Sequence, residues 1–86
     1  MEYSIDLKNV ASVYDLHEAI KESLDLPSYY GENLDALYDV LEDMPSGTVI
    51  HFVNCADAYD SIEKYMESLE EMCQEIENDM EILFMA

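Results

Sequence analysis

The sequence predicts an α/β fold, a small three-stranded parallel sheet packed with three or four helices. Apolar residues alternate with polar ones, or form a β-branched run, near the start, the middle and the end of the chain. Stretches with an apolar residue every three or four positions separate these segments, which is helical spacing. Strands separated by helices usually pair in parallel through right-handed crossovers. With 86 residues there is room for one core, so we expect a single domain over residues 1–86.

The first strand and the first helix are predicted within residues 1–26. Alternation of apolar and polar residues over 2–7 predicts the strand. Ser12 is a typical helix N-cap, and apolar side chains then recur at helical spacing over residues 13–24. The Leu26-Pro27 step ends this helix, because a residue before proline is displaced from the α region.

A second helix is predicted after a tight aromatic loop, residues 28–33. Asn33 is a good N-cap, and the apolar residues that follow stand at i, i+3, i+4 and i+7, the spacing of a core-facing stripe. Pro45-Ser46-Gly47 ends the segment. The stripe consists of Leu34, Leu37, Tyr38 and Leu41.

The second half of the chain predicts a strand, a long helical region and a last strand. Residues 48–53 are β-branched and aromatic, which is typical of a buried central strand. Helical spacing from about residue 57 to 77 predicts one long helix or two helices joined at a bend. Packing on the sheet explains this spacing better than a coiled coil, because it covers only about three heptads. Residues 80–85 form the last strand, and the order of elements is β-α-α-β-α-β.

The charge of the chain excludes several classes of partner. There are 21 Asp and Glu and only three Lys, for a net charge of -18. The acids are spread, with eleven in residues 1–43 and ten in residues 44–86. A chain without a basic patch binds neither nucleic acid nor an anionic membrane surface. The charge also opposes self-association, so we expect a monomer when the protein is free.

The location of the protein is predicted from what the sequence lacks. No stretch approaches the roughly 20 apolar residues of a membrane helix, and the first residues have neither the basic start nor the apolar stretch of a signal peptide. We therefore expect a cytoplasmic protein. Cys55 and Cys73 are expected to be reduced, because two cysteines are too few for a disulfide scaffold.

No catalytic, metal or cofactor site is indicated by the sequence, and we do not expect an enzyme. No nucleophile stands beside a base, and there is no glycine-rich phosphate loop. His17 and His51 lack zinc-ligand spacing and are interpreted as structural residues. The carboxylates form no EF-hand loop.

Three carboxylates fall on one side of the second helix. At 100° per residue, Glu42, Asp35 and Asp39 lie at about 80°, 100° and 140° from Leu34, beside the apolar stripe. Like charges one turn apart destabilise an isolated helix by a few tenths of a kcal/mol. A solvated face is the ordinary interpretation of such charges. The sharper hypothesis is a recognition ridge flanked by tyrosines, as in a binding hot spot.

The segment from residue 26 to 39 resembles the signature of the barstar family. It reads Leu-Pro-Ser-Tyr-Tyr-Gly-Glu-Asn-Leu-Asp-Ala-Leu-Tyr-Asp. Asp15-Leu16-His17 and the order of elements are similar too; the likeness is specific over about residues 13–41 and architectural beyond them. Barstars inhibit guanyl-specific ribonucleases of the barnase type. The resemblance implies a three-stranded parallel sheet packed with helices, and a segment around the second helix that plugs the ribonuclease active site.

The resemblance also implies roles for individual residues. Asp39 would be the chief mimic of substrate phosphate, and Asp35 would support it. The family uses a glutamate of its last helix as a secondary contact, for which Glu70 and Glu71 are candidates. Tyr38 replaces a tryptophan of barstar, which reduces the apolar contact area. The predicted partner-binding residues are Tyr29, Gly31, Asn33, Leu34, Asp35, Tyr38, Asp39 and Glu42.

The predicted partner is a cationic protein, either a secreted ribonuclease or a ribonuclease toxin. The protein would then serve a bacterium as an inhibitor or as an immunity protein. The alternative function is a generic acidic interaction module for a cationic protein that is not a ribonuclease. Such a module would not need the Tyr29-Tyr30-Gly31 loop beside Asp35 and Asp39.

Overall fold

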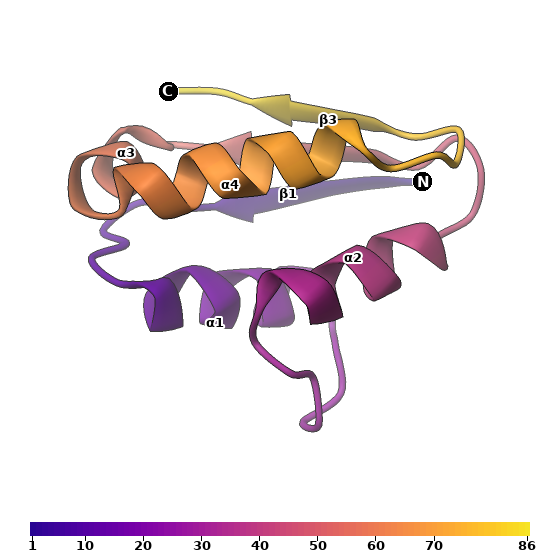
Figure 1. The fold of residues 1–86 in the computed structure, drawn as a ribbon, viewed down its shortest axis with the longest axis horizontal. Coiled ribbons are helices and arrows are strands. Elements are labelled where there is room, and N and C mark those ends of the chain that lie inside the picture. Colours follow the sequence, from indigo (N-terminus) through magenta and orange to yellow (C-terminus); the bar gives the residue numbers. More distant parts are fainter.

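The computed structural model describes residues 1–86 and contains three strands and four helices (Figure 1). The predicted order of elements is confirmed, and the long helical region is divided in two. None of the helices has both the length and the apolar character that a membrane crossing requires. The elements are β1 Glu2–Asp6, α1 Val13–Ser23, α2 Leu34–Glu42, β2 Val49–Val53, α3 Ala56–Ser61, α4 Glu63–Gln74 and β3 Glu81–Phe84.

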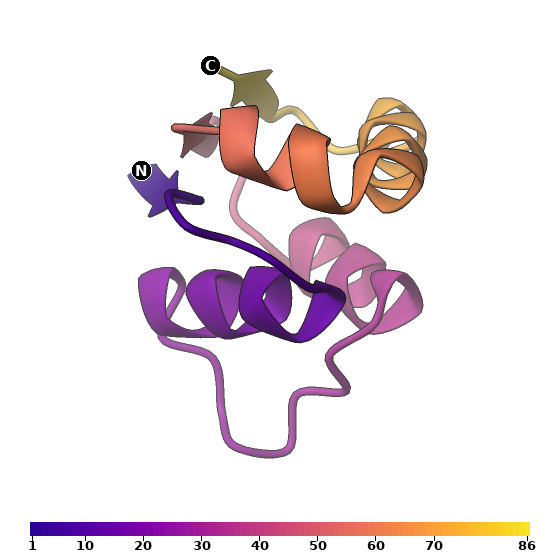
Figure 2. The ribbon, with the colours of Figure 1, turned by 90° about the vertical axis from the view of Figure 1, so that its left-hand side faces the viewer.

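The three strands form one parallel sheet in the order β1-β2-β3, as predicted. Both crossovers move the chain in the same direction across the sheet. Because parallel crossovers are right-handed with few exceptions, two such crossovers place all their helices on one face. Figure 2, which views the strands end on, shows the four helices on one side of the sheet.

β2 is the central strand, as predicted, but the one-sided arrangement buries only one of its faces. In β2, Ile50 and Phe52 point into the core, whereas His51 lies half-buried on the opposite, open face. Phe52 pairs with Ile5 of β1 and with Phe84 of β3. The Phe52 and Phe84 rings stack with their centres 4.8 Å apart. The core therefore lies between one face of the sheet and the helices.

The ends of α1 are set by side-chain and backbone hydrogen bonds. Ser12 caps the helix as predicted, since its Oγ accepts from the N–H of Asp15 at 3.1 Å. At the other end Asp25 has a φ of 52°, and the N–H of Leu26 donates to the carbonyl oxygen of Lys21 at 2.9 Å. This is the Schellman arrangement. It ends the helix at Ser23, before the proline that was predicted to end it.

The break between α3 and α4 lies at Ile62, with φ -135° and ψ 49°. The Ile62 N–H completes α3 by donating to Ala58, and its carbonyl oxygen begins α4 by accepting from Met66. Met66 and Leu69 of α4 are fully buried. The helical spacing of apolar residues continues across the break. The sequence therefore did not distinguish one long helix from two.

Candidate partner-binding surface

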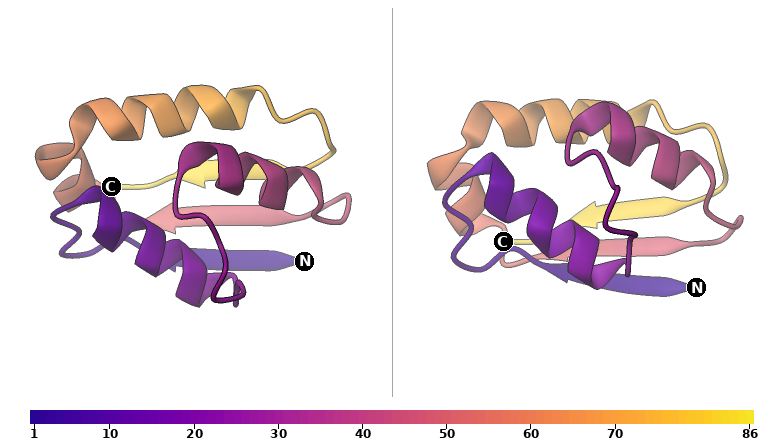
Figure 3. Two further views of the ribbon diagram at one scale, coloured as in Figure 1. Left: turned by 60° about the horizontal axis from the view of Figure 1, so that its bottom comes forward. Right: turned by 90° about the horizontal axis from the view of Figure 1, so that it is seen from below.

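The loop between α1 and α2 protrudes from the molecule on the side away from the sheet (Figures 1 and 2). Figure 3 shows it joining the ends of the two helices, which lie side by side over the sheet. Tyr29 of this loop is 87% exposed, whereas the next residue, Tyr30, is 7% exposed. The Tyr30 N–H donates to the carbonyl oxygen of Pro27 at 3.0 Å, which closes a tight turn. The loop thus presents one tyrosine to solvent and buries the other.

Tyr30 is held by the fully buried side chain of His17 on α1. Nδ1 of His17 lies 2.8 Å from the Tyr30 hydroxyl, and Nε2 lies 2.7 Å from the Tyr65 hydroxyl on α4. Burial lowers the pKa of His17, so its neutral form is favoured. Burial raises the pKa of Tyr30, and the nearby Tyr65 and Glu32 raise it further. His17 is structural, as predicted, and it joins the loop to two helices.

Gly31 and Asn33 shape the entry into α2. Asn33 caps the helix as predicted, with its Oδ1 accepting from the Ala36 N–H at 2.8 Å and its Nδ2 donating to the Gly31 carbonyl oxygen at 3.2 Å. A Cβ on Gly31 would lie 3.1 Å from the Cβ of Ala36, closer than ordinary contact. The left-handed residue of this loop is Glu32, with a φ of 52°. Gly31 is therefore needed for close approach to the helix.

A hollow of about 220 Å³ lies between this loop and α2. Tyr29 and Asp39 both line it, together with apolar residues. A carboxylate beside an aromatic ring suits a guanidinium, ammonium or imidazolium group, because the ring face and the anion both attract a cation. The lining residues are Pro27, Tyr29, Tyr30, Gly31, Ala36, Asp39 and Val40.

The acidic ridge of α2 continues from this hollow along the helix. Asp35 and Asp39 are exposed, and Glu42, one turn further, is half-buried. Asp35 lies in the first turn, where the helix dipole stabilises a negative charge. Asp39 and Glu42 lie beyond the first turn and gain little from the dipole. Their mutual repulsion is therefore only partly offset within the helix.

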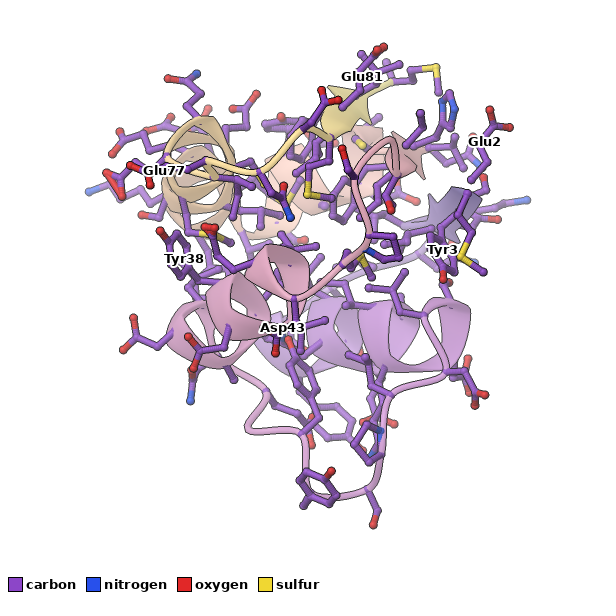
Figure 4. All side chains as sticks on the ribbon, turned by 90° about the vertical axis from the view of Figure 1, so that its right-hand side faces the viewer. Glu2, Tyr3, Tyr38, Asp43, Glu77 and Glu81 are labelled. Atoms are coloured by element: carbon purple, nitrogen blue, oxygen red, sulfur yellow. The ribbon has the colours of Figure 1, made fainter.

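The predicted apolar stripe of α2 divides into two parts. Leu37 and Leu41 are buried, and Leu34 packs partly buried against the core, as predicted. Tyr38 is half-buried and is absent from the side chains that pack on the core, contrary to the prediction. Figure 4 shows it on the side of α2 that faces Glu77. Loss of water raises the pKa of Tyr38, and the carboxylates of Glu42, Glu77 and Glu75 raise it further.

Glu75 and Glu77, which the sequence did not single out, therefore carry negative charge near Tyr38. Of the two candidate acids of the last helix, Glu71 is exposed on α4, and Glu70 lines a cavity of about 280 Å³ together with Cys73 and Phe84. The sheet topology could have revealed that Glu75 and Glu77 lie near the end of α2. The segment after α4 enters β3, the segment after α2 enters β2, and the starts of neighbouring parallel strands lie side by side.

Other chemistry-bearing residues do not gather into a site. No group of three or more His, Cys, Asp and Glu side chains is placed to hold a metal ion. Cys55 and Cys73 are both free thiols. Burial raises the pKa of both, and the nearby Glu70 carboxylate contributes, so that Cys73 reaches about 12. Neither thiol is activated as a nucleophile.

Two comparisons with known proteins agree with this geometry. The family model described as "Barstar (barnase inhibitor)" matches residues 1–84. A protein of Bacillus subtilis (strain 168) named "Putative ribonuclease inhibitor YrdF" is 32% identical over 79 residues, which cover 88% of this chain and 85% of that protein. The match extends through α4 and β3, beyond the segment that carried the resemblance in the sequence.

Proposed function

Since this chain belongs to the barstar family of ribonuclease inhibitors, we propose that it blocks the active site of a guanyl-specific ribonuclease of the barnase type with α2 and the loop before it. Asp39 takes the place of a substrate phosphate, and Asp35 supports it. Tyr29, Gly31, Asn33, Leu34 and Tyr38 provide the surrounding contacts. The target is a secreted ribonuclease or a ribonuclease toxin, from which a bacterium protects itself with an inhibitor kept in the cytoplasm.

The observation that supports this proposal is the hollow that both Asp39 and the exposed Tyr29 line. A ribonuclease active site must be cationic to hold RNA phosphates, so it offers the groups that such a hollow binds. Glu42 and Glu77 extend the negative surface beside Tyr38. The net charge of -18 adds a long-range field that speeds the encounter with a cationic enzyme.

The experiment is a titration of a purified barnase-type ribonuclease with this protein, measured as the rate of RNA cleavage. We expect stoichiometric inhibition, and an inhibition constant that rises between 50 and about 500 mM salt because salt screens the charges. Asp39→Asn should weaken inhibition by about 30-fold or more, since a charge-assisted hydrogen bond contributes about 2 kcal/mol.

The matched control is Asp60→Asn, which removes one charge from an exposed acid on α3. It should leave inhibition nearly unchanged, because it lies outside the proposed surface. Equal inhibition by Asp39→Asn and wild type would refute the role of the ridge. A wild-type protein that inhibits no guanyl-specific ribonuclease would instead support the generic acidic module.

A further inference from the structure

Asn78, in the connection between α4 and β3, is bonded to the C-terminal end of α2. Its Nδ2 donates to the carbonyl oxygens of Leu41 at 2.9 Å, Glu42 at 3.3 Å and Met44 at 3.3 Å. All three partners are acceptors, so the nitrogen of the amide must face them. The last carbonyl groups of a helix have no partner within the helix. Asn78 supplies one from a segment 34 to 37 residues away.

The residues on both sides of Asn78 join the same two segments. The Ser46 hydroxyl donates to the Asp79 carboxylate at 3.3 Å, and the Gly47 N–H donates to the carbonyl oxygen of Asp79. On the other side, Glu77 lies near Tyr38 (Figure 4). Hydrogen bonds thus join the residues that follow α4 to those at the end of α2. Asn78 lies at the centre of this junction.

The stability of the fold does not explain why this position holds asparagine. Oδ1 of Asn78 is buried and has no hydrogen-bond partner. An orphaned buried acceptor destabilises a protein about as much as one or two hydrogen bonds stabilise it. The Leu41 carbonyl oxygen also accepts from the Met44 N–H at 3.2 Å, so it keeps a partner without Asn78. The orphaned acceptor therefore offsets part of what these hydrogen bonds contribute, and the amide also fixes the geometry of the junction.

We propose that Asn78 is a positioning residue, which holds the acids of α2 and Glu77 in one arrangement before the partner binds. The inference rests on the proposed function, because the arranged acids are those of the proposed inhibitory surface. A surface that is already ordered loses less conformational freedom on binding and binds more tightly. Without Asn78 the end of α2 and the segment after α4 would shift relative to each other, and fewer carboxylates would meet the enzyme together.

The first test compares the inhibition constants of wild type, Asn78→Ala and Asn78→Asp against a barnase-type ribonuclease. We expect about tenfold weaker inhibition for Asn78→Ala, the order of loss when one or two side chains must be ordered on binding. Asn78→Asp should be weaker still, since a carboxylate repels the carbonyl oxygens. The urea midpoint of Asn78→Ala should stay close to wild type. The control is Ser61→Ala, which removes the hydroxyl that donates to the carbonyl oxygens of Val10 and Asp57, and should leave inhibition unchanged.

The second test measures the placement of Glu77 in the free protein. The titration of Tyr38 is followed by NMR in wild type and in Asn78→Ala. In Asn78→Ala the pKa of Tyr38 should fall toward its ordinary value, because the carboxylate of Glu77 moves away. An unchanged Tyr38 titration, or unchanged inhibition by Asn78→Ala, would overturn the inference. If wild type inhibits no ribonuclease but the Tyr38 pKa falls in Asn78→Ala, the positioning role stands and the proposed function fails.

Discussion

Replacing His17 by leucine should destabilise the protein far more than the same change at His51. His17 is fully buried, and its two ring nitrogens bond the hydroxyls of Tyr30 and Tyr65. Leucine has nearly the volume of histidine, so packing changes little and the two hydroxyls lose their partner. His51 lies half-buried on the open face of the sheet, where water replaces any bond that is lost.

The expected loss follows from those two hydroxyls. A buried polar group without a partner destabilises a protein by about 1–3 kcal/mol. Tyr30 is nearly buried and Tyr65 is half-buried, so Tyr30 should contribute near 2 kcal/mol and Tyr65 about 1 kcal/mol. The sum of about 3 kcal/mol is a large part of the 5–15 kcal/mol that is usual for small domains. At about 4–8 °C for each kcal/mol, Tm should fall by roughly 12–24 °C.

The assay is urea unfolding at pH 8, followed by far-UV circular dichroism, for wild type, His17→Leu and His51→Leu. Tyr30→Phe in combination with His17→Leu completes a double-mutant cycle. The phenylalanine removes the orphaned hydroxyl, so the double variant should be more stable than the sum of the single changes predicts. A loss of less than about 0.5 kcal/mol in His17→Leu, the range of ordinary surface substitutions, would contradict the buried role of His17, and so would additivity of the two changes.

Three further predictions concern protonation, the recognition loop and a thiol. Because burial lowers the pKa of His17 in the folded protein, the unfolded chain binds the proton more tightly. The stability that His17 contributes should therefore be complete above pH 6.5 and should decline as the pH falls toward the folded pKa. The slope should be at most about 1.4 kcal/mol per pH unit. This pH dependence should be absent in His17→Leu. Gly31→Ala should weaken ribonuclease inhibition, since its Cβ would meet Ala36 at 3.1 Å, whereas Gly47→Ala (φ 86°, with no atom within 4 Å) should lose about 1 kcal/mol of stability and keep inhibition. The pKa of Cys73, raised to about 12, should make this thiol nearly inert to Ellman's reagent at pH 8 until urea unfolds the protein; rapid reaction of the native protein would contradict this burial.

Local patterns were enough to predict the elements and their order. Ser12 and Asn33 cap helices because their side chains satisfy backbone N–H groups two or three residues away, which is a property of neighbouring residues. Apolar residues recur every second position in strands and every three or four positions in helices, and this difference distinguished the two. The end of α1 was predicted too late in the sequence, at the Leu26-Pro27 step. The helix already ends at Ser23, because the Schellman hydrogen bonds of Asp25 and Leu26 close it before the proline.

Contacts between distant segments were not predictable in the same way. His17 meets Tyr65 across 48 residues of sequence, and no local pattern pairs them. Tyr38 has the spacing of a core residue, yet it lies beside Glu77, a neighbour that depends on where α4 ends. The ridge of Asp35, Asp39 and Glu42 was predictable because three positions on one helix fix their own angles. The residues of this surface that lie outside α2 could be predicted only from the sheet topology.

If the protein acts as proposed, the acidic surface of α2 occupies the phosphate-binding centre of a ribonuclease. The most direct measurement is the apparent affinity of this protein for a barnase-type ribonuclease at increasing concentrations of guanosine 3′-monophosphate, which binds that centre. We predict strict competition: the apparent Kd rises in proportion to the nucleotide, and no complex contains all three components. A ternary complex, or a Kd that does not respond to saturating nucleotide, would contradict the account.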